Sequence, residues 1–275
     1  YLELETLEEP NFYDGKIFFE VLYKIDKSMA ENVQAYYNQS QEFRNYIEMW
    51  VHEAKTPLAT LSIMSHDRKT AEQLKRLDDC VEQVLYYVRA ENAERDYSIS
   101  EVSLEKVIGG VATRNQETLL AKHIELQVQN LDQKVYTDAK WLEFILNQII
   151  SNSIKYGSTK ITIKASVQNH KTTLEIIDNG IGIRDKDLPR IFDKSFTGQN
   201  GHGAQAKYST GMGLYIAKTL CDKLGHQISA TSRSGEFTAI KLIFSKNQLY
   251  EVIEHAAHAD PNLPKDEPYK KVSQS

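Results

Sequence analysis

A chain of 275 residues, of which 41% are hydrophobic, is long enough to bury a substantial core and to form two compact units. Its formal net charge of -5 argues against a dedicated nucleic-acid-binding protein, because such proteins carry a positive field that displaces counterions from phosphates. The two cysteines, Cys80 and Cys221, fit no metal-binding spacing, which favours a reducing compartment over a disulfide framework. No run approaches the roughly 20 apolar residues that cross a bilayer, so we expect no membrane span in this chain.

The first part of the chain has the periodicity of long helices. Between about residue 17 and residue 95 there is no glycine, and Pro57 is the one proline. Apolar residues recur there in steps of three or four, the spacing of a coiled-coil or helix-bundle seam. The first run is Val21, Ile25, Met29 and Val33, and the second is Phe43, Ile47, Trp50, Ala54, Leu58 and Leu61.

The apolar pattern loses its register at Ser65-His66-Asp67-Arg68 and then resumes. The new seam comprises Leu74, Leu77, Val81, Val84 and Val88. Two long amphipathic helices joined by a short polar turn form a helical hairpin. Since one hairpin cannot enclose its own apolar stripe, we expect two copies to pair as a symmetric four-helix bundle.

From Ser98 the chain alternates between helical segments and short β-branched runs. The expected helices are Leu104–Lys122, Asp138–Tyr156 and Gly211–Leu224. The expected strands are Ile124–Val128, Lys160–Val167, Thr172–Ile177, Gln227–Thr231 and Thr238–Phe244, with a hairpin loop at Gln168–Lys171. This order predicts an α/β sandwich with helices on one face of a mixed sheet. The polar, proline-containing sequence after Phe244 is expected to fray.

His52 is a candidate nucleophile because it points away from the apolar seam of the first helix. On a helical wheel at about 100° per residue it lies about 160° from the centre of the seam, and Thr56, Ala59 and Ile63 continue the same face. A nucleophile that must meet both a nucleotide and a partner protein needs such exposure. Glu53 can accept a hydrogen bond from one ring nitrogen, which leaves the lone pair of the other nitrogen free to attack.

By position alone, an exposed histidine on a helix is more often a solvated surface residue than a nucleophile. The sequence Trp50-Val51-His52-Glu53-Ala54-Lys55-Thr56-Pro57-Leu58, however, resembles the phosphoacceptor box of histidine kinases, His-Glu-x-x-Thr-Pro. The Trp-Val pair resembles the subgroup with small membrane sensors that often responds to cell-envelope-active peptides. Pro57 lacks a backbone donor, so we expect the helix to bend just past His52.

The predicted helix Asp138–Tyr156 carries a polar stripe of Gln148, Asn152 and Lys155 opposite an apolar one. An amide oxygen can ligate magnesium and an ammonium group can bind phosphate oxygens, so the stripe could serve a nucleoside triphosphate. Taken alone, a solvated helix face is the more common explanation of such a stripe.

Two glycine-containing motifs follow. In the first, a predicted strand ends at Asp178 and is followed by Asn179-Gly180-Ile181-Gly182. The aspartate could accept a hydrogen bond from the amino group of adenine. An ordinary turn can have the same sequence. In the second, Ser209-Thr210-Gly211-Met212-Gly213-Leu214 opens a helix and presents backbone N–H groups that suit a phosphate. Between them, the polar stretch from Thr197 to Ser209 is typical of a mobile lid.

In this order the motifs resemble the N, first glycine, F and second glycine boxes of the histidine-kinase ATPase domain, which has the Bergerat ATP-binding fold. The resemblance runs from about Gln41 to Phe244. It implies that Asn152 holds magnesium, Lys155 phosphate, Tyr156 the edge of the nucleotide and Asp178 the adenine. The remaining pocket residues that it implies are Gly180, Gly182, Gly211, Met212, Gly213 and Leu214.

Three positions depart from the family pattern. Gln148 stands where many members carry a first asparagine, so it is a second candidate magnesium ligand with a different side chain. Tyr215 replaces a frequent third glycine of the second glycine box, and Ser195 replaces a glycine of the F box. None of these changes removes a group that the chemistry requires.

The resemblance predicts four regions: a linker or signalling helix after a membrane segment (1–40), a dimerisation and phosphotransfer domain (41–95), an ATP-binding catalytic domain (96–245) and a polar tail (246–275). The expected fold is an α-helical hairpin forming a dimeric four-helix bundle, followed by an α/β sandwich of Bergerat type. The expected activity is magnesium- and ATP-dependent phosphorylation of His52, with transfer to an aspartate of a response regulator.

The resemblance also implies partners and a location. We expect a homodimer, a cognate response-regulator receiver domain that docks over Thr56, Ala59 and Ile63, and phosphatase activity toward that regulator through Thr56. A membrane transporter is a further expected partner, and nucleic acid is not. The chain would be the cytoplasmic portion of a cell-membrane protein. Phosphorylation within one chain and between two chains are both compatible with the sequence.

Two other classes of protein compete with this interpretation. Another enzyme with the same ATP fold, such as an anti-sigma serine kinase or a chaperone-type ATPase, would keep the glycine boxes but would not need the box around His52. A dimeric scaffold with a vestigial ATP site would not need His52, Asn152 and Asp178 together.

Overall fold

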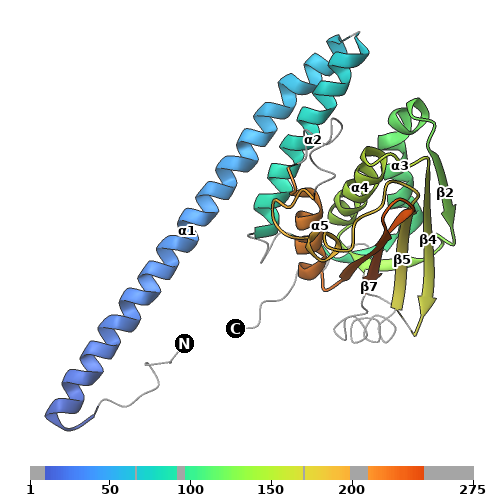
Figure 1. Cartoon of the computed structure of the whole chain (residues 1–275). Coiled ribbons are helices and arrows are strands. Elements are labelled where there is room, and N and C mark those ends of the chain that lie inside the picture. The colour runs from blue at the N-terminus through green and yellow to red at the C-terminus, as the bar shows by residue number, and fades with distance from the viewer. Residues whose placement is uncertain (1–9, 66, 92–96, 170, 199–209, 245–275) are drawn as a thin grey trace, which may run out of the picture. The chain divides into compact units, whose positions relative to one another are not determined.

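The computed structural model describes residues 10–65, 67–91, 97–169, 171–198 and 210–244. The chain divides into two compact units, Tyr1–Asn92 and Ala93–Ser275 (Figure 1). The turn residue His66, most of the expected lid (199–209) and the expected tail (246–275) lie outside the described residues. Among the described helices, none combines the length and the apolar character that a bilayer crossing requires.

The first unit is a helical hairpin, as the sequence predicts. The helix α1 (Tyr13–Met64) is followed by α2 (Arg68–Glu91), and α1 continues through Pro57 without interruption. Arg89 Nε lies 3.0 Å from Glu48 Oε1, and this ion pair joins the end of α2 to α1. At the start of α2, Asp67 Oδ2 accepts from the backbone N–H of Thr70 at 2.9 Å, which holds the pKa of Asp67 below its usual range.

The seam inside the hairpin differs in part from the predicted one. Its buried cluster consists of Val51, Leu58 and Val81, against which Ile47, Ala54, Leu74 and Leu85 pack. Val51, which is 1% exposed, was absent from the predicted seam. The predicted seam residues Phe43, Trp50, Leu61, Leu77 and Val84 remain exposed in the single chain. The apolar arc of α1 is therefore wider than one partner helix can cover, and the hairpin buries one flank of it.

The second unit contains a five-stranded mixed sheet with the order β2-β4-β5-β7-β6. Its strands are β2 (Glu125–Gln129), β4 (Lys160–Gln168), β5 (Lys171–Asp178), β6 (Gln227–Arg233) and β7 (Phe237–Phe244). β2 pairs with β4 in parallel and every other pair is antiparallel. The helices are α3 (Leu104–Ala121), α4 (Ala139–Lys155), α5 (Gly213–Lys223) and the short 3-10 helix η2 (Leu188–Arg190). This architecture confirms the predicted α/β sandwich.

Helices α3, α4 and α5 cover one face of the sheet (Figure 1). Alternate strand residues such as Ile163, Ile176 and Ile240 form a cross-strand row that is buried toward them. The intervening residues form a polar row on the other face, where Lys164 Nζ lies 2.8 Å from Glu175 Oε2. The sheet thus has one apolar and one polar face, as expected from the alternation of its strands.

A second sheet of two strands, β1 (Ser100–Ser103) and β3 (Lys134–Thr137), was not predicted. Each strand leads directly into a helix: Ser103 caps α3, and Asp138 caps α4 by accepting from the backbone N–H of Trp141 at 2.9 Å. The second carboxylate oxygen of Asp138 accepts from the backbone N–H of Ser98 at 2.8 Å. The small sheet therefore fixes the starts of α3 and α4 relative to each other.

His226 connects this small sheet to the start of β6. Its Nε2 lies 3.1 Å from the hydroxyl oxygen of Thr137. Its ring packs edge-on against the Phe244 ring, with the two ring centroids 4.9 Å apart. The ring is buried, and its Nδ1 has no hydrogen-bond partner among the described residues. Because burial disfavours the charged form, the pKa of His226 is lowered from 6.5 to about 4.

We expect the second unit to lose stability as pH falls from about 6.5 toward 4. Over this pH range the unfolded state binds a proton on His226 that the folded state excludes. Above pH 6.5 the contribution of His226 to the free energy of unfolding is constant. The shift corresponds to a loss on the order of 3 kcal/mol. Urea titrations at several pH values, followed by the fluorescence of buried Trp141 in a Trp50→Phe background, measure this loss.

The matched comparison is between His226→Gln and His123→Asn, since His123 is exposed in the same unit. The first substitution should flatten the pH dependence and the second should leave it unchanged. An unchanged pH dependence in His226→Gln would show that carboxylates, and not His226, cause the acid sensitivity.

Candidate functional site

His52 lies on the exposed face of α1, as the sequence predicts. His52, Glu53, Thr56 and Ala59 are exposed, and Ile63 at the end of the same face is 81% exposed. Neither His52 nor Glu53 forms a side-chain hydrogen bond to another described residue, so the expected bond between them is not formed here. Neighbouring residues on a helix do not face each other, which explains why the two side chains remain apart.

The hydroxyl of Thr56 donates to the backbone carbonyl of His52, one turn earlier, at 3.3 Å. Thr60 repeats this bond one turn later, to the carbonyl of Thr56 at 3.1 Å. Because the Thr56 proton is directed into the helix, the lone pairs of its oxygen remain available as acceptors on the exposed face.

The polar residues expected to hold a nucleotide lie along the second half of α4. The helix is buried over most of its circumference by residues that include Leu142, Ile145, Leu146, Ile149 and Ile150. Gln148 is also buried, whereas Asn152 and Lys155 are half-buried. The Asn152 amide makes no side-chain hydrogen bond to another described residue, so its oxygen is available to a ligand. A solvated helix face therefore does not describe this stripe.

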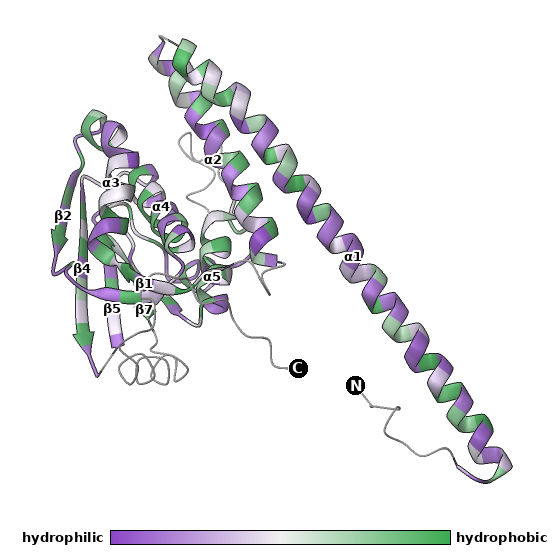
Figure 2. Cartoon of the chain, turned by 180° about the vertical axis from the view of Figure 1, so that it is seen from behind, coloured by the Kyte–Doolittle hydropathy of each residue, from purple (hydrophilic) through white to green (hydrophobic). Residues whose placement is uncertain are grey.

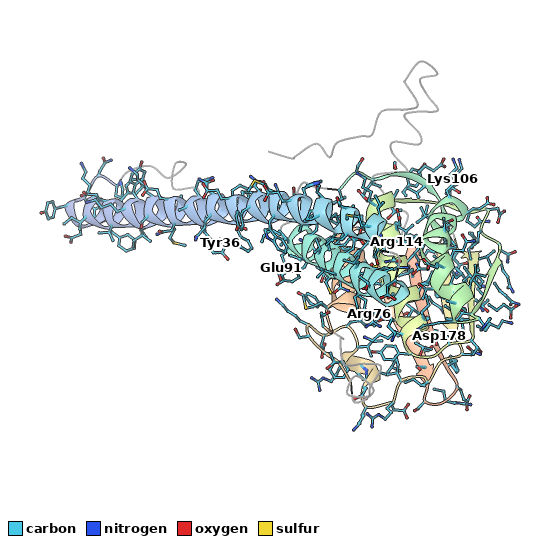
Figure 3. All side chains as sticks on the ribbon, turned by 90° about the horizontal axis from the view of Figure 1, so that it is seen from above. Tyr36, Arg76, Glu91, Lys106, Arg114 and Asp178 are labelled. Carbon is cyan, nitrogen blue, oxygen red and sulfur yellow. The ribbon has the colours of Figure 1, made fainter. Side chains whose placement is uncertain are left out.

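Asp178 ends β5 and is 8% exposed. Its Oδ1 accepts from the backbone N–H of Gly180 at 2.9 Å, and its Oδ2 accepts from the hydroxyl of Ser153 at 2.8 Å. The carboxylate is thus fixed by two donors, one from its own loop and one from α4. Figure 3 shows Asp178 within the second unit. The contact with Ser153 was not predicted, because Ser153 belongs to no polar stripe of the helix.

The loop after β5 approaches two other segments closely at its glycines. A Cβ on Gly180 would lie 2.8 Å from the carbonyl oxygen of Tyr156, at the end of α4. A Cβ on Gly182 would lie 2.1 Å from the carbonyl oxygen of Arg233, and its φ of +63° is one that side chains rarely adopt. These glycines are required by packing, and the same packing places Asp178 beside the end of α4.

The second glycine motif packs against Ser195 and Phe196, which precede the expected lid. A Cβ on Gly211 would lie 2.5 Å from the backbone of Ser195, and the Ser195 hydroxyl lies 3.7 Å from the sulfur of Met212. Ser195 has a φ of +61°, so it adopts the left-handed conformation that favours glycine. The departure from the family glycine at this position therefore retains a glycine-like backbone.

Within the second unit, the structure brings the end of α4 together with Asp178 and the loop that follows it. Lys155 Nζ lies 5.5 Å from the centre of the Tyr156 ring, and the backbone N–H of Ile181 donates to the Tyr156 carbonyl at 3.2 Å. α5, which begins at Gly213 and carries Leu214 in its first turn, packs against α4. A carboxylate acceptor, an amide oxygen and an ammonium group thus share one region, which suits an adenine base, a divalent cation and phosphates.

The chain is similar in sequence to a known family and to several known proteins. Residues 137–248 match the model described as histidine kinase-, DNA gyrase B- and HSP90-like ATPase. The chain is 34% identical to the sensor protein BceS of Halalkalibacterium halodurans, over 84% of this chain and 71% of BceS. It is 30% identical to the sensor protein kinase GraS of Staphylococcus aureus, over 90% of this chain and 75% of GraS. It is 34% identical to the sensor histidine kinase YxdK of Bacillus subtilis, and there it spans 64% of the length of the relative.

Two solved structures share the fold. The histidine kinase AdeS of Acinetobacter baumannii matches with a TM-score of 0.53 and 20% identity, over 72% of this chain and 98% of AdeS. Full-length ShkA in complex with AMPPNP matches with a TM-score of 0.55 and 20% identity, over 73% of this chain and 45% of ShkA.

We expect Gly182→Ala to destabilise the second unit more than Gly157→Ala. Both glycines have a positive φ, so both variants incur about 1–2 kcal/mol for the left-handed conformation. At Gly157 nothing lies within 4 Å of the added Cβ, whereas at Gly182 the added carbon meets backbone and should cost a further 1–3 kcal/mol, roughly the cost of overpacking. Equal losses in thermal denaturation would contradict the close approach between Gly182 and Arg233.

Proposed function

The chain belongs to the sensor histidine kinases, and from that premise we propose that it uses ATP to phosphorylate its own His52 and then transfers the phosphoryl group to an aspartate of a response regulator. The observation that carries this proposal is the exposure of His52 on a helix of the first unit, in a chain whose second unit carries the candidate nucleotide-binding groups. Among the other described histidines, His226 is buried and held neutral, which disfavours it as a nucleophile.

The proposed phosphorylation is a displacement at phosphorus. A ring nitrogen of His52 attacks the γ-phosphorus of ATP, a P–N bond forms, and the bond from phosphorus to the β-phosphate oxygen breaks as ADP leaves. Glu53 would orient the ring by accepting its other N–H, a bond that is not formed among the described residues. In the second step the P–N bond breaks as the phosphoryl group passes to a carboxylate oxygen of the regulator.

The residues present fit ATP and magnesium. Asp178 would accept from the amino group of adenine, Tyr156 would border the base, and Lys155 would neutralise phosphate oxygens. Asn152 would ligate magnesium through its amide oxygen, and magnesium supplies charge neutralisation at the phosphates. Gln148 is buried and already interacts with another group of the protein. Its side chain is therefore a weaker candidate magnesium ligand than that of Asn152.

A second copy of the chain would cover apolar residues that the single hairpin leaves exposed. Phe43, Trp50 and Leu61 on α1, with Leu77 and Val84 on α2, form an apolar flank that the single hairpin leaves uncovered. The N-terminal half of α1 carries further exposed apolar residues, including Ile25, Met29 and Tyr36. Figure 2 shows hydrophobic segments along this half of the helix, and Figure 3 labels Tyr36 there. Burial of such a flank against its symmetric copy gives a four-helix bundle, which supports the proposed homodimer.

The exposed face of α1 would bind the receiver domain of the regulator. Ile63 is 81% exposed and aligned with His52, Thr56 and Ala59, which supports a docking surface. The lone pairs of the Thr56 oxygen could then accept a hydrogen bond from a water molecule that attacks the acyl phosphate. The membrane location and the transporter partner that the family resemblance suggests stay predictions.

Incubation with magnesium and ATP should label the protein with phosphate that is labile in acid and stable in base, as a phosphoramidate is. His52→Gln should abolish the label while leaving nucleotide binding in place, because His52 lies outside the nucleotide-binding unit. His123→Gln, which removes an exposed histidine of the second unit, is the control and should keep the label. Acid-stable label that persists in His52→Gln would favour a serine kinase of the same fold.

Thr56→Ala should keep autophosphorylation and transfer but slow the dephosphorylation of the regulator about tenfold, the effect of one lost hydrogen bond in the transition state. The measurement is the decay of phosphorylated regulator in the presence of ADP. Thr60→Ala is the matched control, since Thr60 makes the same bond to the helix backbone one turn away. Equal decay with both variants would reduce Thr56 to a helix-shaping residue, and loss of autophosphorylation would implicate the helix around Pro57.

A further inference from the structure

The nucleotide site contains a contact that none of its sequence motifs predicts. Ser153 lies next to Asn152 on α4, and its hydroxyl donates to Asp178 Oδ2 at 2.8 Å. The two residues are 3% and 8% exposed, so this bond is shielded from water. We propose that Ser153 is a positioning residue that holds the Asp178 carboxylate in the orientation that accepts the amino group of adenine. This inference rests on the proposed function, in which Asp178 recognises adenine.

The geometry shows why the carboxylate needs a second donor. The backbone N–H of Gly180 donates to Asp178 Oδ1 at 2.9 Å, but Gly180 is only two residues further along the same loop. The terminal torsion of an aspartate is broad, so one donor at one oxygen leaves the carboxylate free to turn about its last bond. Ser153 binds the other oxygen from a different element, α4, and the two donors together fix the plane of the carboxylate.

Asp178 keeps acceptor capacity for a ligand in this arrangement. A carboxylate offers about four lone-pair positions, and the two protein donors use two of them. Ser153 Oγ also lies 3.3 Å from the carbonyl oxygen of Ile149, but its single proton favours the shorter bond to the charged oxygen. A third donor, such as the amino group of adenine, can therefore be accepted without displacing either protein donor.

Ser153 is itself fixed by Ser158, which provides a matched control. The Ser158 hydroxyl donates to the backbone carbonyl of Ser153 at 2.7 Å, and Ser158 is 4% exposed. Ser158→Ala thus removes a buried hydroxyl from the same corner of the protein without removing a donor to Asp178. A general loosening of this corner would affect both serine variants, whereas loss of carboxylate orientation would affect Ser153→Ala alone.

The test compares two nucleotides on the full chain by calorimetry: ATP, and purine riboside 5′-triphosphate, which lacks the amino group. The ratio of their dissociation constants measures recognition of that group. Ser153→Ala should reduce the preference for ATP about 3- to 10-fold, the effect of one weakened hydrogen bond, while the analogue binds as before. Ser158→Ala should leave the ratio unchanged, and Asp178→Asn should reduce it at least as much as Ser153→Ala.

The outcomes separate the inference from the proposed function. If the wild-type protein prefers ATP and Asp178→Asn loses that preference while Ser153→Ala keeps it, the positioning role is overturned and the adenine site stands. Equal weakening of both nucleotides by Ser153→Ala would also overturn it, since it would indicate a structural role. If the wild-type protein binds both nucleotides equally, Asp178 does not recognise adenine, and the inference is overturned together with that part of the proposed function.

Discussion

The second unit depends on the close approach of the end of α4 to the loop that follows β5. The carbonyl oxygen of Tyr156 lies where a side chain on Gly180 would need to be, and it also accepts the backbone N–H of Ile181. One turn earlier, Ser153 reaches Asp178. Because the helix and the loop are in backbone contact, the groups that would bind phosphate and magnesium lie next to the group that would bind adenine, and neither set needs a long side chain to reach the other.

This approach is possible because α4 is fixed along its whole length. Asp138 caps its first turn and also binds Ser98, the small sheet of β1 and β3 holds its start beside that of α3, and apolar residues surround its middle. A buried amide pair, Asn115 Nδ2 to Asn147 Oδ1 at 2.8 Å, ties α3 to α4 in one register. The polar end of α4 is therefore positioned by the buried remainder of the helix, as binding groups on rigid elements generally are.

The sequence predicted those features that repeat along the chain and missed those that depend on a single contact. The helical hairpin, the three helices and five strands of the second unit and the buried Asp178 follow from periodicity and from turn residues. The strands β1 and β3 have four residues each and bury one apolar residue apiece, Val102 and Val135, so they carry no periodic signal. The contact of Ser153 with Asp178 joins residues 25 positions apart, and a short serine side chain gives no sign of its partner.

The predicted seam of α1 was partly wrong for a related reason. Periodicity identifies an apolar arc, but it cannot divide that arc between the partner helix of the same chain and a second chain. The hairpin buries the flank that contains Ile47, Val51 and Leu58, and it leaves the flank that contains Phe43 and Trp50 exposed. His52 belongs to neither flank, and it remains exposed although the flank that contains Val51 is buried. That is why the exposure of His52 was predicted correctly although the seam was not, while its role as a nucleophile stays a prediction.

Pro57 lies inside α1, five residues after His52, where proline is normally unfavourable. A proline inside a helix removes the backbone donor that would bind the carbonyl one turn earlier, which here belongs to Glu53, and typically costs about 3 kcal/mol. The helix nevertheless continues, with the Thr56 hydroxyl adding a bond to the carbonyl of His52 just before the gap. A sequence selected for helix stability alone would not place proline there. The helix therefore lacks one backbone hydrogen bond within one turn of His52, which we propose receives the phosphoryl group, and of Thr56, which we propose acts on the regulator.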